Sequence, residues 1–274
     1  MKTYQLIIAY DGTHYGGWQV QPNAISIQEL IQEALSTILR QPMYVIASGR
    51  TDAGVHALAQ SAHFRYPHPL ELPKLHLSLN ALLPLDIRIM EIKEVSPAFH
   101  ARFSAESKIY HYHLHLDPVI DPFQRLYTYR VPHRVDLELL AQATRYFVGE
   151  HDFTSFANKP EATANKNCVR HISRIDCVPT TGGVYLAFEG NGFLYKMVRN
   201  IVGTLLDVCA HRLAVSDIAN IMAKKDRRAS GRAAPPHGLF LIEVNYPDQL
   251  LSNNTSNDEM CSAPKRTHSS TCSL

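Results

Sequence analysis

The sequence predicts an α+β protein made of two similar αβ-sandwich halves, each an antiparallel sheet with helices on one face. Three observations support this class. Strand-like and helix-like patterns recur in the same order in the two halves of the chain. Turns that contain glycine separate successive strands, as at Thr181-Gly182-Gly183. Finally, 45% hydrophobic and 19% charged residues over 274 positions are typical of a globular chain that buries a substantial core.

The first half, residues 1–105, is expected to form one such unit. Its first helix carries a capping box, because Ser26 precedes the helix and Glu29 stands three residues later. Pro42 follows the end of that helix. Apolar content or alternation marks each strand. The expected strands span 4–10, 44–48, 57–66 and 86–95, and the expected helices span 26–42 and 72–84.

The second half, residues 106–247, repeats this order of elements without repeating the sequence. Its longest helix, 195–213, places apolar residues at helical spacing. After Pro247 the chain is rich in Ser, Thr and Asn, so residues 248–274 are expected to form a disordered polar tail. The expected strands span 107–116, 171–180, 183–193 and 238–246, and the expected helices span 136–149, 195–213 and 214–225.

Composition and charge exclude several classes of protein. The five cysteines are an odd number without a CxxC pair, which favours a reduced cytoplasmic compartment over a disulfide framework. No apolar run approaches the ~20 residues of a membrane span. The opening "MKTYQLIIAYDG" indicates a strand rather than a signal peptide. We therefore expect a cytoplasmic protein without membrane contact, whose net charge of +2 by itself indicates no partner.

The stretch "SGRTDAGVHA", residues 48–57, is the first candidate for chemistry. Gly49 and Gly54 let the backbone turn sharply and let a ligand approach closely. Arg50 and Asp52 between them are two residues apart, so in an extended segment they share a side. The alternative is a surface turn whose aspartate binds loop amides or caps a helix.

Two basic segments are further candidates. In "GNGFLYKMVRNIVG" (190–203), Arg199 lies near the start of a helix, and Gly203 one turn later leaves the same face bare for a bulky partner. The alternative is an arginine at the rim of an apolar stripe. A run of five cations at 224–232 is sufficient for several phosphate contacts. The alternative is that this run is the solvated end of a helix. These cations are Lys224, Lys225, Arg227, Arg228 and Arg232.

Tyrosines and histidines alternate along the strand 107–116. Tyr110 lies near the start of this strand, on the face that carries the tyrosines, where its ring can stack against a ligand. The histidines of the other side invite a metal site, but their spacing lacks the HExxH or mixed Cys/His patterns of zinc proteins. A metal-dependent hydrolase that uses Asp52, His56 and His63 together with the histidines of residues 111–115 is an alternative. The four-residue spacing of Asp52 and His56 would favour it only on a helix, and Gly54 between them disfavours a helix. No nucleotide-binding motif is present, so no cofactor is expected.

Six blocks in order between residues 4 and 247 resemble the A family of tRNA pseudouridine synthases, which isomerise uridines of the anticodon stem-loop. The block containing "GRTDAGVHA" is highly specific for that family. The tail after Pro247 is not covered by the resemblance. The blocks are "YDGTHYGGWQVQP", "SIQELIQEAL", "GRTDAGVHALAQ", "FHARFSAESKIYHYHL", "NGFLYKMVRNIVG" and "APPHGLFLIEVNY".

The resemblance implies a role for four residues, all of which match the family in type. The nucleophilic aspartate of "GRTD" is Asp52, and the arginine thought to help displace the target base is Arg50. The active-site tyrosine of "KIYHY" is Tyr110, and the arginine of "MVRN" that pairs with the aspartate is Arg199. One departure, Pro236-His237-Gly238 where the family usually has a small residue before the glycine, is not expected to alter the chemistry.

The resemblance also implies the partner and the arrangement of the site. The substrate would be the tRNA anticodon stem-loop, at positions 38–40, with no cofactor and no metal. The active site would lie in a cleft between the halves 1–105 and 106–247, and the protein would be a homodimer that binds tRNA across both subunits. An RNA-binding protein of the same fold without catalysis is the alternative, which the intact Asp52, Tyr110 and Arg199 disfavour.

Overall fold

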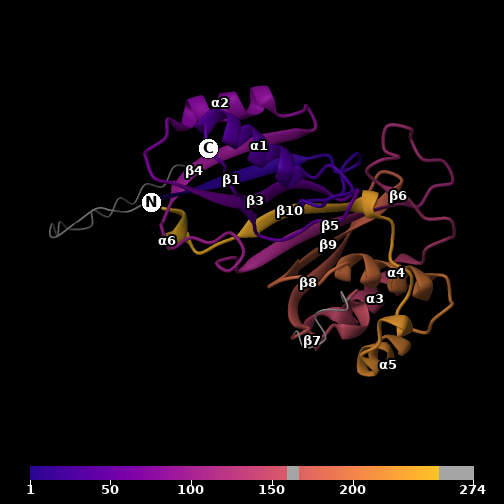
Figure 1. Cartoon of the computed structure of the whole chain (residues 1–274). Coiled ribbons are helices and arrows are strands. Elements are labelled where there is room, and N and C mark those ends of the chain that lie inside the picture. The colour runs from indigo at the N-terminus through magenta and orange to yellow at the C-terminus, as the bar shows by residue number, and fades with distance from the viewer. Residues whose placement is uncertain (159–166, 253–274) are drawn as a thin grey trace, which may run out of the picture.

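One mixed sheet runs through the computed structural model, which describes residues 1–158 and 167–252 (Figure 1). Its strands in chain order are Lys2–Tyr10 (β1), Ile46–Ala47 (β2), His56–Tyr66 (β3), Ile87–Val95 (β4), Ser107–His115 (β5), Tyr129–Arg130 (β6), Gly149–Asp152 (β7), Val169–Thr180 (β8), Gly183–Gly190 (β9) and Leu239–Asn245 (β10). The strand order is β4-β1-β3-β10-β5-β9-β8-β7, with β2 beside β3 and β6 beside β5.

The expectation of a separate sheet in each half is wrong. The two halves are joined because β10, the last strand, lies between β5 and β3. β10 is antiparallel to β5 but parallel to β3, where only Phe240 and Leu241 have register partners. Apart from the short β5–β6 pair, the other strand pairs are antiparallel, as the sequence predicts for each half. The fold is therefore a mixed α+β fold with one large sheet.

The helices are divided between the two ends of this sheet (Figure 1). α1 and α2 lie beside β4, β1 and β3, whereas α3, α4 and α5 lie beside the strands of the second half. The predicted capping box is confirmed at α1, where Ser26 Oγ accepts from Glu29 N and Glu29 Oε2 accepts from Ser26 N, both at 3.3 Å. The helices span Ile27–Leu39 (α1), Leu72–Leu82 (α2), Leu137–Thr144 (α3), Met197–Cys209 (α4), Asp217–Lys224 (α5) and Asp248–Leu251 (α6).

The start of the expected tail is helical instead. Residues 248–251 form α6, and Leu250 and Leu251 pack against a small cluster of buried side chains. Leu250 O also accepts a hydrogen bond from Ser96 N at 3.1 Å. The apolar pair of leucines explains the difference, because it gives this segment surface to bury. The remainder of the predicted tail, 253–274, lies outside the described residues.

A single large core spans both halves, so the sheet and its helices are packed as one unit. Its members include Tyr4 and Ile8 of β1, Tyr112 of β5 and Ile201 of α4, all of them fully buried. Along residues 1–158 and 167–252 there is no helix of the length and apolarity that crossing a membrane requires. The core thus fixes α4, from the second half, relative to the loop between β2 and β3 of the first half.

Candidate active site

The loop between β2 and β3 carries Asp52, and local contacts determine its shape. Val55 N donates to Asp52 O at 3.1 Å, which closes a tight turn, and Gly54 has φ +75°. That backbone conformation suits glycine because it lacks a Cβ. On the N-terminal side of Asp52, Thr51 Oγ1 lies 2.8 Å from the hydroxyl of Tyr10, on β1. The loop therefore presents Asp52 from a turn that is anchored on both sides.

A second loop, residues 11–19, packs directly against the backbone of this turn. Trp18 N donates to Thr51 O at 3.1 Å. Gly17 has φ +95°, and a Cβ there would lie 2.5 Å from Thr51 O. A side chain at Gly17 would therefore displace the turn. The sequence analysis treated this loop only as a glycine-rich turn, although its adjacent glycines, Gly16 and Gly17, were the available signal.

Asp52 and Arg199, which are far apart in the sequence, form an ion pair. Arg199 Nη1 lies 2.6 Å from Asp52 Oδ2, and the two side chains are only 11% and 16% exposed. Arg199 Nε donates to Ala234 O at 2.8 Å, which holds the guanidinium at the start of α4. A nearly buried, charge-assisted contact of this kind is stronger than a surface pair. The pairing expected from the resemblance is therefore present.

Tyr110 lies beside this pair. It is buried on β5, and its ring meets the edge of Phe193 at a centroid distance of 5.1 Å. Burial, with smaller contributions from Tyr10 and the charge of Asp52, raises the pKa of Tyr110 above its usual value. Its hydroxyl is therefore neutral at neutral pH. Phe193, a second aromatic ring at the site, was not singled out from the sequence.

Arg50 does not join the ion pair. Its side chain is exposed, and its Nε donates to Gln19 Oε1 at 3.0 Å. Gln19 is a neutral partner, so the guanidinium has no charge partner among the residues that the structure describes. Of the four expected residues, Asp52, Arg199 and Tyr110 are thus together, while Arg50 lies at the outer side of the same loop.

The face of α4 that Gly203 leaves bare is already filled by the chain itself. A Cβ at Gly203 would collide with Arg232 O, and Gly231 N donates to Thr204 Oγ1 at 2.9 Å. Ala234 N donates to Arg199 O at 2.9 Å in the same segment. The bulky partner expected at this face is therefore the backbone of residues 231–234.

The basic run at 224–232 offers fewer free cations than the sequence suggests. Arg227 turns inward, where Nη2 donates to Asn200 Oδ1 at 2.7 Å, and burial lowers its pKa. Lys225 pairs with Asp152 at 2.9 Å, and Arg228 pairs with Asp226 at 2.8 Å. The local carboxylates thus compete with phosphate for two of the five cations, and a third is structural.

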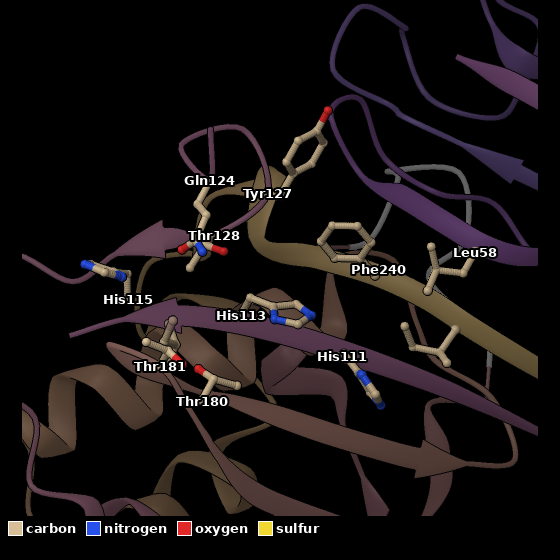
Figure 2. Close-up of a pocket in the computed structure, with 12 residues that line it drawn as sticks. Leu58, His111, His113, His115, Gln124, Tyr127, Thr128, Thr180, Thr181 and Phe240 are labelled. Carbon is tan, nitrogen blue, oxygen red and sulfur yellow. The ribbon is translucent and has the colours of Figure 1, made fainter. Parts of the chain in front are cut away.

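The histidines of β5 lie on the face opposite Tyr110 and line a cavity of about 540 Å³ (Figure 2). Figure 2 shows His113 next to Phe240 of β10, with Leu58 of β3 beyond, and the centroids of the His113 and Phe240 rings are 5.2 Å apart. Burial lowers the pKa of both histidines, that of His113 to about 4. None of the four expected active-site residues lines this cavity.

The geometry does not support the metal-dependent hydrolase. Within residues 1–158 and 167–252, no three His, Cys, Asp or Glu side chains form a group that could hold a metal ion. His56 uses both ring nitrogens: Nδ1 accepts from Gly12 N at 3.1 Å, and Nε2 lies 3.0 Å from Leu126 O. His63 Nδ1 likewise accepts from Ala101 N at 3.2 Å.

Comparisons with known proteins find similar chains over most of this sequence. A family model described as tRNA pseudouridine synthase matches residues 6–104 and 143–247. The chain is 55% identical over 251 residues to tRNA pseudouridine synthase A 1 of Protochlamydia amoebophila, covering 91% of this chain and 98% of that relative. It is 45% identical to tRNA pseudouridine synthase A of Chlamydia muridarum, covering 94% and 99%, and 42% identical to that of an Exiguobacterium species, covering 90% and 98%.

Proposed function

The chain belongs to the tRNA pseudouridine synthase family, and from this premise we propose that it isomerises uridine to pseudouridine in the tRNA anticodon stem-loop, with Asp52 starting the reaction. The observation that carries the proposal is the nearly buried ion pair between Asp52 and Arg199, 2.6 Å apart. A carboxylate held by one cation on a rigid turn is a group prepared for nucleophilic or base catalysis.

The reaction needs little besides such a carboxylate. The bond between C1′ and N1 breaks, the base turns, a bond forms between C1′ and C5, the hydrogen on C5 leaves as a proton, and N1 gains a proton. No electrons or groups are exchanged with another reactant. Asp52 can add covalently to the sugar or base, or it can remove a sugar proton. Both routes use the carboxylate in its charged form, and the guanidinium of Arg199 lies in direct contact with it.

We propose that Arg50 helps the target base to leave the helical stack. Extruding a base costs a few kcal/mol, and a side chain that fills the vacated space recovers part of that cost. Arg50 suits this role because it is exposed and its hydrogen bond to Gln19 can be exchanged for contacts with RNA. It lies two residues from Asp52, so the two side chains can enter the stem-loop together.

Tyr110 is proposed to stack on the uracil. Its buried ring is braced by Phe193, which would hold a stacked base in one orientation. The raised pKa of Tyr110 opposes the alternative that a tyrosinate removes the proton from C5. A neutral hydroxyl can still accept or donate a hydrogen bond near C5.

The site is proposed to lie in a cleft between the halves 1–105 and 106–247. Asp52 comes from the first half, whereas Tyr110 and Arg199 come from the second, so the RNA would be held where the two halves meet. After residue 247, the proposed third part begins with α6 instead of an unstructured tail.

We also propose a cytoplasmic homodimer. A single chain with net charge +2 has little positive charge for a large polyanion, and a second copy would join another basic surface to the site. The cavity face in Figure 2 carries Leu58, 55% exposed, and half-buried Phe240, which could contribute apolar area to an interface. Light scattering at micromolar concentration should give twice the chain mass of 30.8 kDa, and a 30.8 kDa particle would contradict the dimer.

The function is tested by mapping pseudouridine in a tRNA transcript treated with the purified protein, by carbodiimide labelling and primer extension. We expect conversion of uridines at positions 38–40 and none elsewhere in the anticodon stem-loop. A matched transcript with cytidine at those positions should give no signal. A failure to convert any uridine in several tRNAs would overturn the proposal.

A further inference from the structure

Lys108 stands beside the catalytic loop but has no part in the chemistry proposed above. It lies on β5 two residues before Tyr110, so both side chains are on the same face of the strand. Its Nζ donates to Ser48 O at 2.6 Å, at the start of the loop that carries Asp52. The side chain is half-buried, and this bond uses one of the three N–H groups of the ammonium.

No carboxylate of the described residues forms an ion pair with this lysine. None of the residues that the structure describes forms an ion pair with Lys108, Arg102 or Arg170. The residues opposite Lys108 on the adjacent strands, Gly190 and Val244, are uncharged. Burial, followed by the positive charges of Arg102 and Arg170, lowers the pKa of Lys108 to about 8. Three cations from three segments thus influence one another, and within residues 1–158 and 167–252 none of them has an ion-pair partner.

Arg102 belongs to a turn, residues 99–104, that is fastened beside the catalytic loop. Tyr246 OH donates to Ala101 O at 2.7 Å, and Ala101 N donates to His63 Nδ1. On this turn Phe103 is 76% exposed, and the guanidinium of Arg102 lies 5.5 Å from the centre of its ring. An exposed aromatic ring beside a cation is the usual platform for an unpaired base of a single strand.

Arg170 approaches the same region from β8. Its Nε would lie 3.6 Å from a Cβ at Gly192, which directly precedes Phe193, the ring that contacts Tyr110. Arg170 Nη1 donates only to the backbone, to Asn167 O and Val169 O. Its positive charge is therefore not neutralised by these contacts.

We propose that Lys108, Arg102 and Arg170 form a site for the backbone phosphates of the nucleotides next to the target uridine, and that Phe103 stacks on a neighbouring base. This inference rests on the proposed function, because it takes the RNA to be bound with its uridine at Asp52. Residues two apart on a strand are separated by about 7 Å, a distance that one nucleotide covers. Tyr110 would thus face the target base while Lys108 faces an adjoining phosphate.

The test is the salt dependence of tRNA binding, measured by fluorescence anisotropy with every variant in an Asp52→Asn background so that the uridine is not consumed. Each lost phosphate contact lowers the slope of log K against log salt by about 0.7 for a single strand, or 0.9 for a duplex. Lys108→Ala, Arg102→Gln and Arg170→Gln should each show this loss. Lys74→Ala, at an exposed lysine of α2, is the matched control and should keep the parent slope.

Phe103→Ala separates stacking from charge. It should weaken binding about tenfold, as expected for loss of one stacked base, and leave the salt slope unchanged. Lys108 also donates to Ser48 O, so Lys108→Ala removes a contact of the catalytic loop as well as a charge. Lys108→Arg keeps the charge and should keep the slope. Arg102→Gln tests the site at an exposed residue. Unchanged slopes in all three cation variants would overturn the phosphate site.

A pH series gives an independent readout. As pH rises from 7 to above about 8, Lys108 loses its proton, so tRNA affinity should fall in the parent and stay level in Lys108→Arg, whose guanidinium remains charged. The other cations here, Arg102 and Arg170, do not titrate in that range. Pseudouridine formation by the parent protein, measured separately, distinguishes the outcomes: if it occurs while the slopes are unchanged, only the phosphate site fails, and if it does not occur the proposed function fails.

Discussion

Replacing Arg199 with leucine should destabilise the protein chiefly by leaving Asp52 as an uncompensated, nearly buried charge. The side chains of the pair are 11% and 16% exposed, and breaking a buried pair costs about 3–5 kcal/mol. We take the lower end, about 3 kcal/mol, because both groups retain some solvent. Of this, about 1 kcal/mol is the lost bond from Nε to Ala234 O, and about 2 kcal/mol is the orphaned carboxylate.

The double variant Asp52→Asn/Arg199→Leu separates these two parts. It no longer contains the orphaned charge, so relative to Asp52→Asn it should lose only the ~1 kcal/mol of the bond to Ala234 O. The coupling energy of the cycle should therefore be about 2 kcal/mol. For a chain of this size, Arg199→Leu should lower Tm by about 6–12 °C in the parent but by only about 2–4 °C in the Asp52→Asn background.

Thermal unfolding of the four proteins, with urea titration as a second measure, tests the prediction. The matched control is the cycle for Asp207 and Arg212, a pair near the end of α4 whose side chains are 23% and 59% exposed. Its coupling should be below about 1 kcal/mol. If the effects of Asp52→Asn and Arg199→Leu simply add, the buried ion pair is not an energetic unit and the reasoning fails.

Three further predictions concern the backbone and the tyrosine. Gly17→Ala should lower turnover at least tenfold, because its Cβ displaces the catalytic turn. Gly149→Ala is the control, since Gly149 is also at positive φ but a Cβ there has its nearest contact at 3.6 Å. It should cost about 1 kcal/mol of stability and leave turnover unchanged. A cut after Pro247 should lower Tm by several degrees, because α6 is lost, and a cut after Ser252 should not; equal Tm values would show that α6 adds nothing. Because the pKa of Tyr110 is raised, its hydroxyl stays neutral up to pH 9, and Tyr110→Phe should slow tritium release from C5-labelled tRNA about tenfold or less. Tyr110→Ala, which loses the ring, should slow this release at least a hundredfold. Equal losses in the two variants would exclude stacking.

Local signals predicted most of the secondary structure. The capping box at Ser26 and Glu29 located the start of α1, and apolar spacing predicted α4, although both helices are shorter than expected. The position of β10 between β5 and β3 could not be predicted in this way. Its pairing depends on which distant strand edges are free, and the pattern of one strand carries no information about its partners.

For the active site, the resemblance named Asp52, Tyr110 and Arg199, and the structure places them together. Residue types alone left each of them with an ordinary alternative, because an aspartate in a turn or an arginine on a helix is common. Lys108 and Phe193 were missed, since their significance depends on neighbours distant in the chain. Gly203 was noticed but its partner was not, because the segment that fills that face lies about thirty residues later.

The most direct test of the account is tritium release from tRNA labelled at C5 of uridine by Asp52→Asn. This variant keeps the size of the side chain but cannot act as nucleophile or base, and losing a nucleophile typically costs many orders of magnitude in rate. Asp176→Asn, at an exposed carboxylate, is the matched control and should release label like the parent. We expect no release by Asp52→Asn while tRNA binding persists, and release at a rate near that of the parent would contradict the role assigned to Asp52.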